Sequence, residues 1–194
     1  MKKIVALFLL SGLPVLAQSI QKKDGSTIDL AGGKIHVEAG NKRIVYFEKD
    51  SKKEQRVKFK DLKQASWDDF VFQTFEIAGK TRGYYVVAQQ NGKSLLVSKR
   101  TRVKSRGGFE STYTHYEMAI VDAQSQMVDA LEFTDENTDK KIGERAKIIP
   151  MIETHFAGCT KLIEKTRAFE SPASDTQNKT ILVLLNEPTL VKCL

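Results

Sequence analysis

The chain has 194 residues, of which 41% are hydrophobic, 28% charged and 8% aromatic, and its formal net charge is +7. This composition is typical of a globular protein and excludes a disordered, collagen-like or low-complexity chain, because enough apolar residues are present to form a core. The length allows one domain, or one domain with an appended unit. A modest positive charge permits an anionic partner without requiring one.

The first 17 residues have the three parts of an export signal peptide. Met1-Lys2-Lys3 is basic, residues 4–10 are continuously apolar, and the stretch ends at Ala17, where a signal peptidase would cut. The apolar run is shorter than the roughly 20 residues that a spanning helix needs, and no later segment is apolar enough to be transmembrane. We therefore expect residues 1–17 to be removed, which lowers the net charge of +7 by two to +5. We expect the mature chain to be exported to the periplasm or the cell exterior.

Cys159 and Cys193 are the two cysteines of the chain. In an oxidising compartment such a pair indicates a disulfide rather than a metal or redox site. Closing this loop of about 34 residues would stabilise the fold by roughly 3–4 kcal/mol in the chain-entropy treatment. We predict a disulfide between them.

Residues 18–134 are predicted to form a β-rich domain. Residues 56–60 alternate, so that Val57 and Phe59 share one face. Asn91-Gly92, between two β-rich runs, is the strongest hairpin signal. About nine strands at even spacing predict an antiparallel meander, a sandwich or a small barrel. The expected strands span residues 26–30, 34–39, 43–49, 56–60, 70–77, 83–89, 94–103, 113–121 and 126–133.

Residues 135–194 are predicted to form a helical C-terminal unit packed on that domain, which makes the fold class α+β. Residues 135–139 offer N-cap side chains and first-turn acids. Pro150 either kinks the following helix or opens a second one. Residues 180–191 are apolar enough for a last helix or strand. One apolar helical face is formed by Ile142, Ala146, Ile149, Ile152, Phe156, Cys159 and Ile163.

Two stretches of the chain resemble parts of known proteins. The first comprises Lys23-Asp24-Gly25-Ser26, the strands up to Glu48, and residues 57–62 and 65–67, and the second comprises residues 155–162, followed by Cys193 near the end. The first is similar to short β modules, compared with Sm- or SH3-like barrels, in envelope proteins of Bacteroidetes-type bacteria. The second resembles the helical tail of secreted proteins from the same group. The resemblance implies export and a disulfide-tied tail. It brings no catalytic residues.

The stretch from Lys93 to Arg106 is strongly basic and contains no acid. In a continuous strand its alternate cations would share one face, about 6.6–6.8 Å apart. Such a row can bind sulfated or phosphorylated glycans, lipopolysaccharide phosphates or nucleic acid by charge. Nucleic acid is disfavoured as a partner for two reasons. Tyr113 and Tyr116 are the nearby aromatics that could stack on bases, and an exported protein encounters little nucleic acid. The alternative is a solvated strand face or edge. The candidate anion-binding residues are Arg100, Arg102, Lys104 and Arg106.

We predict no catalytic residue, metal site or cofactor from the sequence. His155 and Cys159 have the i, i+4 spacing of two metal ligands, but the expected disulfide uses that thiol. The chain has no GxSxG, SxxK or P-loop pattern. The sequence does not exclude a catalytic triad, because the residues of a triad can be distant in the chain.

Three functions follow from these patterns. The first is a non-catalytic exported envelope or secreted protein that acts as a binding or structural module. The second is a binder of anionic glycan, lipopolysaccharide or phosphate that uses the four cations of the basic stretch. The third is a hydrolase whose site the sequence does not reveal.

Overall fold

The computed structural model describes residues 18–193, except the Arg106 side chain, so the expected signal peptide at residues 1–17 lies outside the described residues. The described chain is mostly antiparallel β-sheet followed by short helices, which confirms the predicted α+β class. Of the architectures expected from the strand spacing, the meander describes β6 to β11, because these strands pair in chain order.

The large sheet has the strand order β11-β10-β9-β8-β7-β6-β1-β2 and is antiparallel along this path. A short final strand, β12, joins it by pairing in parallel with β8. The strands are β1 (Ser19–Lys22), β2 (Thr27–Asp29), β6 (Leu62–Trp67), β7 (Phe70–Ile77), β8 (Lys80–Gln90), β9 (Lys93–Arg106), β10 (Phe109–Val121), β11 (Met127–Thr134) and β12 (Val191–Lys192).

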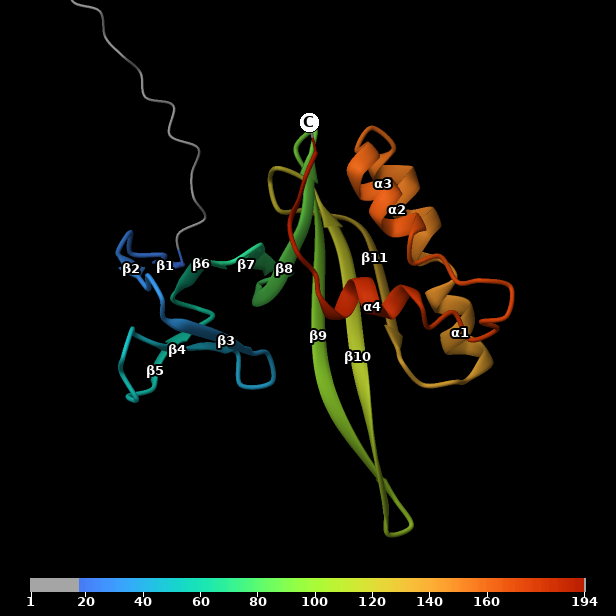
Figure 1. Ribbon diagram of the computed structural model, residues 1–194, viewed down its shortest axis with the longest axis horizontal. Coiled ribbons are helices and arrows are strands. Elements are labelled where there is room, and N and C mark those ends of the chain that lie inside the picture. The colour runs from blue at the N-terminus through green and yellow to red at the C-terminus, as the bar shows by residue number, and fades with distance from the viewer. Residues whose placement is uncertain (1–17, 194) are drawn as a thin grey trace, which may run out of the picture.

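A small second sheet lies between β2 and β6 in the chain. It consists of β3 (Lys34–Glu38), β4 (Arg43–Phe47) and β5 (Gln55–Lys58) in chain order. Its buried residues, such as Ile44 and Val57, share a core with Ile20 of β1 and Phe72 of β7. The small sheet is thereby packed against the first strands of the large one (Figure 1).

Strand β8 changes partners along its length, and this divides the large sheet. Its first half pairs with β7, its second half pairs with β9, and a register irregularity falls between Val86 and Ala88. Strand β12 occupies the edge that β7 leaves free, with Val191 opposite Ala88. The C-terminus is thus held against the half of the sheet that carries the helices.

The C-terminal helices are α1 (Asp139–Arg145), α2 (Ile148–Phe156), α3 (Thr160–Arg167) and α4 (Ile181–Asn186). Thr138 caps α1, because its side chain accepts a hydrogen bond from the Lys141 backbone N–H. Of the two alternatives for Pro150, a second helix is correct. That helix begins at Ile148, so Pro150 lies in its first turn, where a missing N–H costs no helical hydrogen bond. The apolar segment 180–191, for which the sequence predicts a helix or a strand, forms the helix α4 and ends at the first residue of the strand β12.

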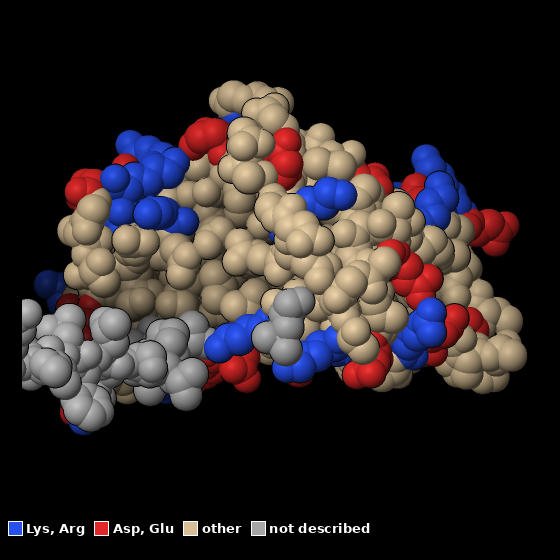
Figure 2. All heavy atoms as spheres, turned by 90° about the horizontal axis from the view of Figure 1, so that it is seen from above, with Lys and Arg blue, Asp and Glu red and all other residues tan. Residues whose placement is uncertain are grey.

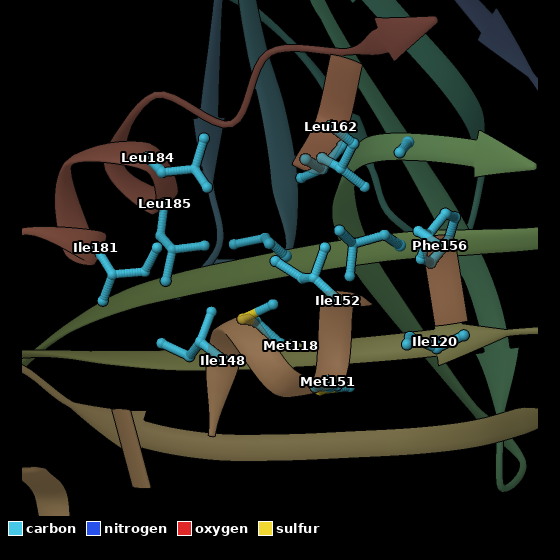
Figure 3. Close-up of a cluster of buried hydrophobic side chains, with 14 of the residues drawn as sticks. Met118, Ile120, Ile148, Met151, Ile152, Phe156, Leu162, Ile181, Leu184 and Leu185 are labelled. Carbon is cyan, nitrogen blue, oxygen red and sulfur yellow. The ribbon is translucent and has the colours of Figure 1, made fainter. Parts of the chain in front are cut away.

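One face of the large sheet is covered by α2, α3 and α4. Met118 and Ile120 of β10 pack beneath Ile152 and Phe156 of α2 and Leu185 of α4, and each of these is at most 1% exposed (Figure 3). Removing such side chains from water is the main source of folding free energy. The helices therefore fix which face of β9 and β10 is buried and which is left for other contacts.

Arg145, at the end of α1, is 1% exposed. Its guanidinium donates hydrogen bonds to the carbonyl oxygens of Thr134, Glu136 and Gln177, at distances of 2.5 to 3.0 Å. The fork of donors suits several carbonyls at once. Arg145 thereby ties the end of β11 to the loop that precedes α4.

Candidate ligand-binding face

The two faces of β9 have opposite character. Leu95 and Val97 point into the core under the helices. Side chains alternate along a strand, so Ser98, Arg100 and Arg102 project from the opposite face. That face also carries Glu117 of β10, which lies directly across from Ser98. Leu96, on the same face, is buried in a separate apolar cluster, so the face is polar only from Ser98 toward the hairpin tip, where it is assembled from neighbouring strands.

The four predicted anion-binding residues occupy alternate positions of β9 in different settings. Arg100 is half-buried at the base of the row, whereas Arg102 and Lys104 are exposed. Lys104 Nζ lies 3.5 Å from Glu136 Oε1. Arg106 ends β9 opposite Phe109, and its side chain lies outside the described part of the structure. The structure thus places Arg100, Arg102 and Lys104 on one strand face, as the alternation predicts, and Arg106 occupies the next alternate position of the strand.

The other two cations of the basic stretch serve the fold. Lys99 points to the helix face, where its Nζ donates to the Asn186 carbonyl over 2.5 Å, and burial lowers the Lys99 pKa. Lys93 Nζ lies 3.5 Å from His155 Nδ1. Alternation along β9 therefore separates the basic stretch into cations that contact the helices and cations that face outward.

The outer part of the β9–β10 hairpin projects from the body as an arm, residues 101–112 (Figure 1). All its residues whose side chains are described are exposed. Even its apolar side chains face water, with Val103 62% and Phe109 83% exposed. Gly107 and Gly108 have positive φ angles of 58° and 82°, which suits the tight turn at the tip. The arm adds no residue to the core clusters.

A cavity of about 270 Å³ opens at the base of this arm. Its walls come from the β3–β4 turn, the segment between β5 and β6, the start of β8 and the polar face of β9 to β11. Cations outnumber acids in the lining, so its charge favours an anion. The lining residues are Ala39, Lys42, Phe59, Lys80, Thr81, Arg82, Gly83, Tyr84, Ser98, Arg100, Glu117 and Glu132.

Glu117 is the buried centre of this cavity wall, with 6% of its surface exposed. Its Oε1 accepts hydrogen bonds from Tyr84 Oη and Arg82 Nη1, each over 2.7 Å. Burial, and then the bond to Glu117, raises the pKa of Tyr84 well above its ordinary value. A buried carboxylate needs such charged and hydrogen-bonded partners. The network holds Glu117 in one orientation.

His115 and Glu132 extend the polar face beside Glu117. His115 lies opposite Arg100, and its Nε2 is 3.6 Å from Glu132 Oε2. Its Nδ1 is buried and has no hydrogen-bond partner among the described residues. Glu132 lies directly across from Glu117, so two carboxylates share this part of the face. No sequence pattern indicated Glu117, Glu132, Arg82 or Tyr84 as part of a site, since they come from three strands, β8, β10 and β11, that are separated in the chain.

At the end of the molecule opposite the arm tip, cations do not form a row without acids as they do on β9. The face seen in Figure 2, which looks from the end away from the arm tip, has Lys and Arg side chains next to Asp and Glu side chains in several places. Interleaved charges of both signs are typical of a solvated surface. The row on β9 differs from that pattern.

Cys159 and Cys193 form the predicted disulfide, with Cα atoms 5.0 Å apart. His155, which has the spacing of a second metal ligand, instead places its Nε2 3.1 Å from Asp129 Oδ2. Within residues 18–193, no three His, Cys, Asp or Glu side chains are grouped to hold a metal ion. No helix in the same range is long and apolar enough to cross a membrane.

No protein-family model, curated protein or solved structure shows significant similarity to this chain. The geometry of the polar face is therefore the basis for any functional assignment.

Proposed function

We propose that the protein is an exported, non-catalytic binding module that recognises an anionic polymer through the outward cations of β9. The observation that supports this proposal is that Arg100, Arg102 and Lys104 share one face of β9, with Arg106 at the next alternate position, and that β9 continues beyond the body into the exposed arm. A charge row of this kind attracts and orients a chain of negative charges.

A role in binding explains the presence of this exposed arm better than a contribution to the stability of the fold. An isolated two-stranded ribbon is marginally stable in water, and ordering its residues costs conformational entropy. Residues 101–112 bury no core side chain in return. A partner that contacts the arm provides the favourable free energy that the fold does not.

Export is supported by two features of the chain. The first 17 residues have the pattern of a signal peptide, and the disulfide is of the kind that persists in oxidising compartments. An exported protein meets sulfated, phosphorylated or carboxylated polymers of the cell envelope. Such polymers match the charge of the arm.

The test compares retention on immobilised heparin and lipopolysaccharide. Changing Arg100, Arg102, Lys104 and Arg106 to Ser should weaken binding at least about tenfold, since each contact of a cation with an anion contributes on the order of 1 kcal/mol or more. The control changes four exposed cations of the small-sheet region, Lys52, Lys53, Lys58 and Lys60, to Ser. Equal retention by the wild type and the arm variant overturns the proposal, as does an equal loss in the control.

A lipid surface is the second candidate, favoured by the exposure of Phe109 at the tip of the arm. An apolar tip beside cations can enter the headgroup region of an anionic membrane. Flotation with phosphatidylglycerol vesicles tests it. If the wild type floats and Phe109→Ser does not, the lipid surface replaces the polymer as the partner.

A further inference from the structure

The cavity and the basic row are parts of one surface. Ser98 and Arg100 line the cavity, and the row continues from Arg100 to Arg102 and Lys104 along the same strand face. A polymer that lies along the row therefore has one of its units at the mouth of the cavity. We infer that the cavity holds one acidic sugar ring of an anionic glycan, an inference that rests on the proposed function.

The cavity has the size for a single ring. Its volume of about 270 Å³ lies just below the range of roughly 300–1,000 Å³ that is usual for drug-sized ligands. Ala39 and the 4% of Phe59 that stays exposed give the wall a small apolar surface, against which the C–H face of a sugar can pack, while the other lining side chains are mainly polar. A linear inorganic anion has no such face.

Glu117 supplies an acceptor for a sugar hydroxyl. Its Oε1 is occupied by Tyr84 and Arg82, whereas its Oε2 has no hydrogen-bond partner among residues 18–193. Oε2 is not enclosed either, because the buried side-chain atoms without a partner in this range are Gln18 Oε1 and His115 Nδ1. The carboxylate is therefore held by one oxygen and can accept a hydrogen bond from a ligand with the other.

Three cations of the lining can hold the acidic group of the ring. Lys42, Lys80 and Arg100 line the cavity, and none of them forms an ion pair in the described part of the chain. A carboxylate or sulfate on the ring would satisfy them by charge-assisted hydrogen bonds. The wall thus offers an acceptor and a set of donors within one cavity.

This combination discriminates between ligands. Glu117 and Glu132 repel a bare anion that brings no hydroxyl, and the three cations bind a neutral sugar more weakly because it offers no charge-assisted hydrogen bond. The structure therefore favours a ring that carries both hydroxyls and a negative group. Uronic acids and sulfated sugars have this chemistry.

The experiment measures binding of oligogalacturonate and of polyphosphate with equal total charge by titration calorimetry. We expect the wild type to prefer oligogalacturonate at least about tenfold, because polyphosphate has no hydroxyl along the chain for Glu117. Ala39→Phe fills the cavity from the β3–β4 turn and should reduce this preference to about one. Ala123→Phe, at an exposed turn outside the cavity lining, is the matched control. Glu117→Gln tests the acceptor directly and should lower the preference in the same direction.

The outcomes separate the two proposals. If Ala39→Phe and Glu117→Gln both keep the preference, the cavity assignment is wrong while binding by the arm stands. If Arg102→Ser with Lys104→Ser leaves the affinity for both polymers unchanged, the proposed function itself is wrong. A wild type that binds polyphosphate as tightly as oligogalacturonate also contradicts the sugar assignment.

Discussion

The Tyr84 hydroxyl donates to Glu117 Oε1 over 2.7 Å, although β8 and β10 are not neighbours in the sheet. The bond passes over β9 at Ser98, which lies opposite Glu117 and is small enough to leave space. Three strands thus cooperate to hold one buried carboxylate at the cavity.

This bond should be measurable as a coupling energy. Tyr84→Phe is expected to lower the free energy of unfolding by about 1–2 kcal/mol, since a buried hydrogen bond to a charged group is lost. In a double-mutant cycle with Glu117→Gln, the coupling should be about 0.5–3 kcal/mol by urea denaturation. Tyr113→Phe, at a half-exposed position on the arm side, is the control and should change stability by less than about 0.5 kcal/mol. A cost for Tyr84→Phe no larger than the control would contradict the buried bond.

Alkaline pH should unfold the protein through its buried tyrosines. Burial raises the pKa of Tyr46, Tyr84 and Tyr116, and it raises the pKa of Tyr85 to about 12. The unfolded chain loses these protons near pH 10, so stability is present below about pH 10 and falls as the pH rises toward 12. Tyr85 alone accounts for roughly 2–3 kcal/mol.

The measurement follows tyrosinate absorbance and circular dichroism together. These four phenols should ionise only as the near-ultraviolet dichroism is lost. Complete ionisation of all tyrosines in a protein that keeps its native dichroism near pH 11 would show that the phenols are not buried.

Gly83, in the first half of β8, should not tolerate a side chain. A Cβ there would lie 2.5 Å from Phe72 Cζ and 2.6 Å from Phe59 Cε2. Gly83→Ala is expected to cost about 1–3 kcal/mol because the packed core must shift. Gly143→Ala, in α1 with no heavy atom within 4 Å of its Cβ, should instead stabilise the protein by roughly 0.5–1 kcal/mol. Thermal unfolding of the two variants should move in opposite directions, and a shift of the same sign in both would refute the account.

The disulfide should stabilise the pairing of β12 with β8 in addition to the fold as a whole. Replacing Cys159 and Cys193 together by Ala should lower the free energy of unfolding by roughly 3–4 kcal/mol. It should also speed amide hydrogen exchange at Val191, because β12 pairs with β8 over two residues and relies on the covalent tie. Slow exchange at Val191 after reduction would show that the strand is held by pairing alone.

Much of the architecture could be predicted from local patterns. Asn91 and Gly92 both have positive φ, 51° and 73°, as a tight hairpin requires, and this is a property of two adjacent residues. Pro150 indicated either a kink or a boundary between two helices, but the sequence did not give its exact position, because the second helix begins two residues earlier, at Ile148. β1 and β6 were not predicted as separate strands, because their pairing joins residues forty or more positions apart.

By itself, the sequence determined the succession of a β-rich part and a helical part, the cysteine pair and the alternation that sets Arg100, Arg102 and Lys104 on one face. These depend on spacing along the chain. Only the tertiary structure decided that this face is the one left open, since α2 to α4 cover the other, and that Glu117 meets Tyr84 and Arg82 there. A cavity wall is made of side chains from strands that are distant in sequence, and their meeting depends on register and packing rather than on any local pattern.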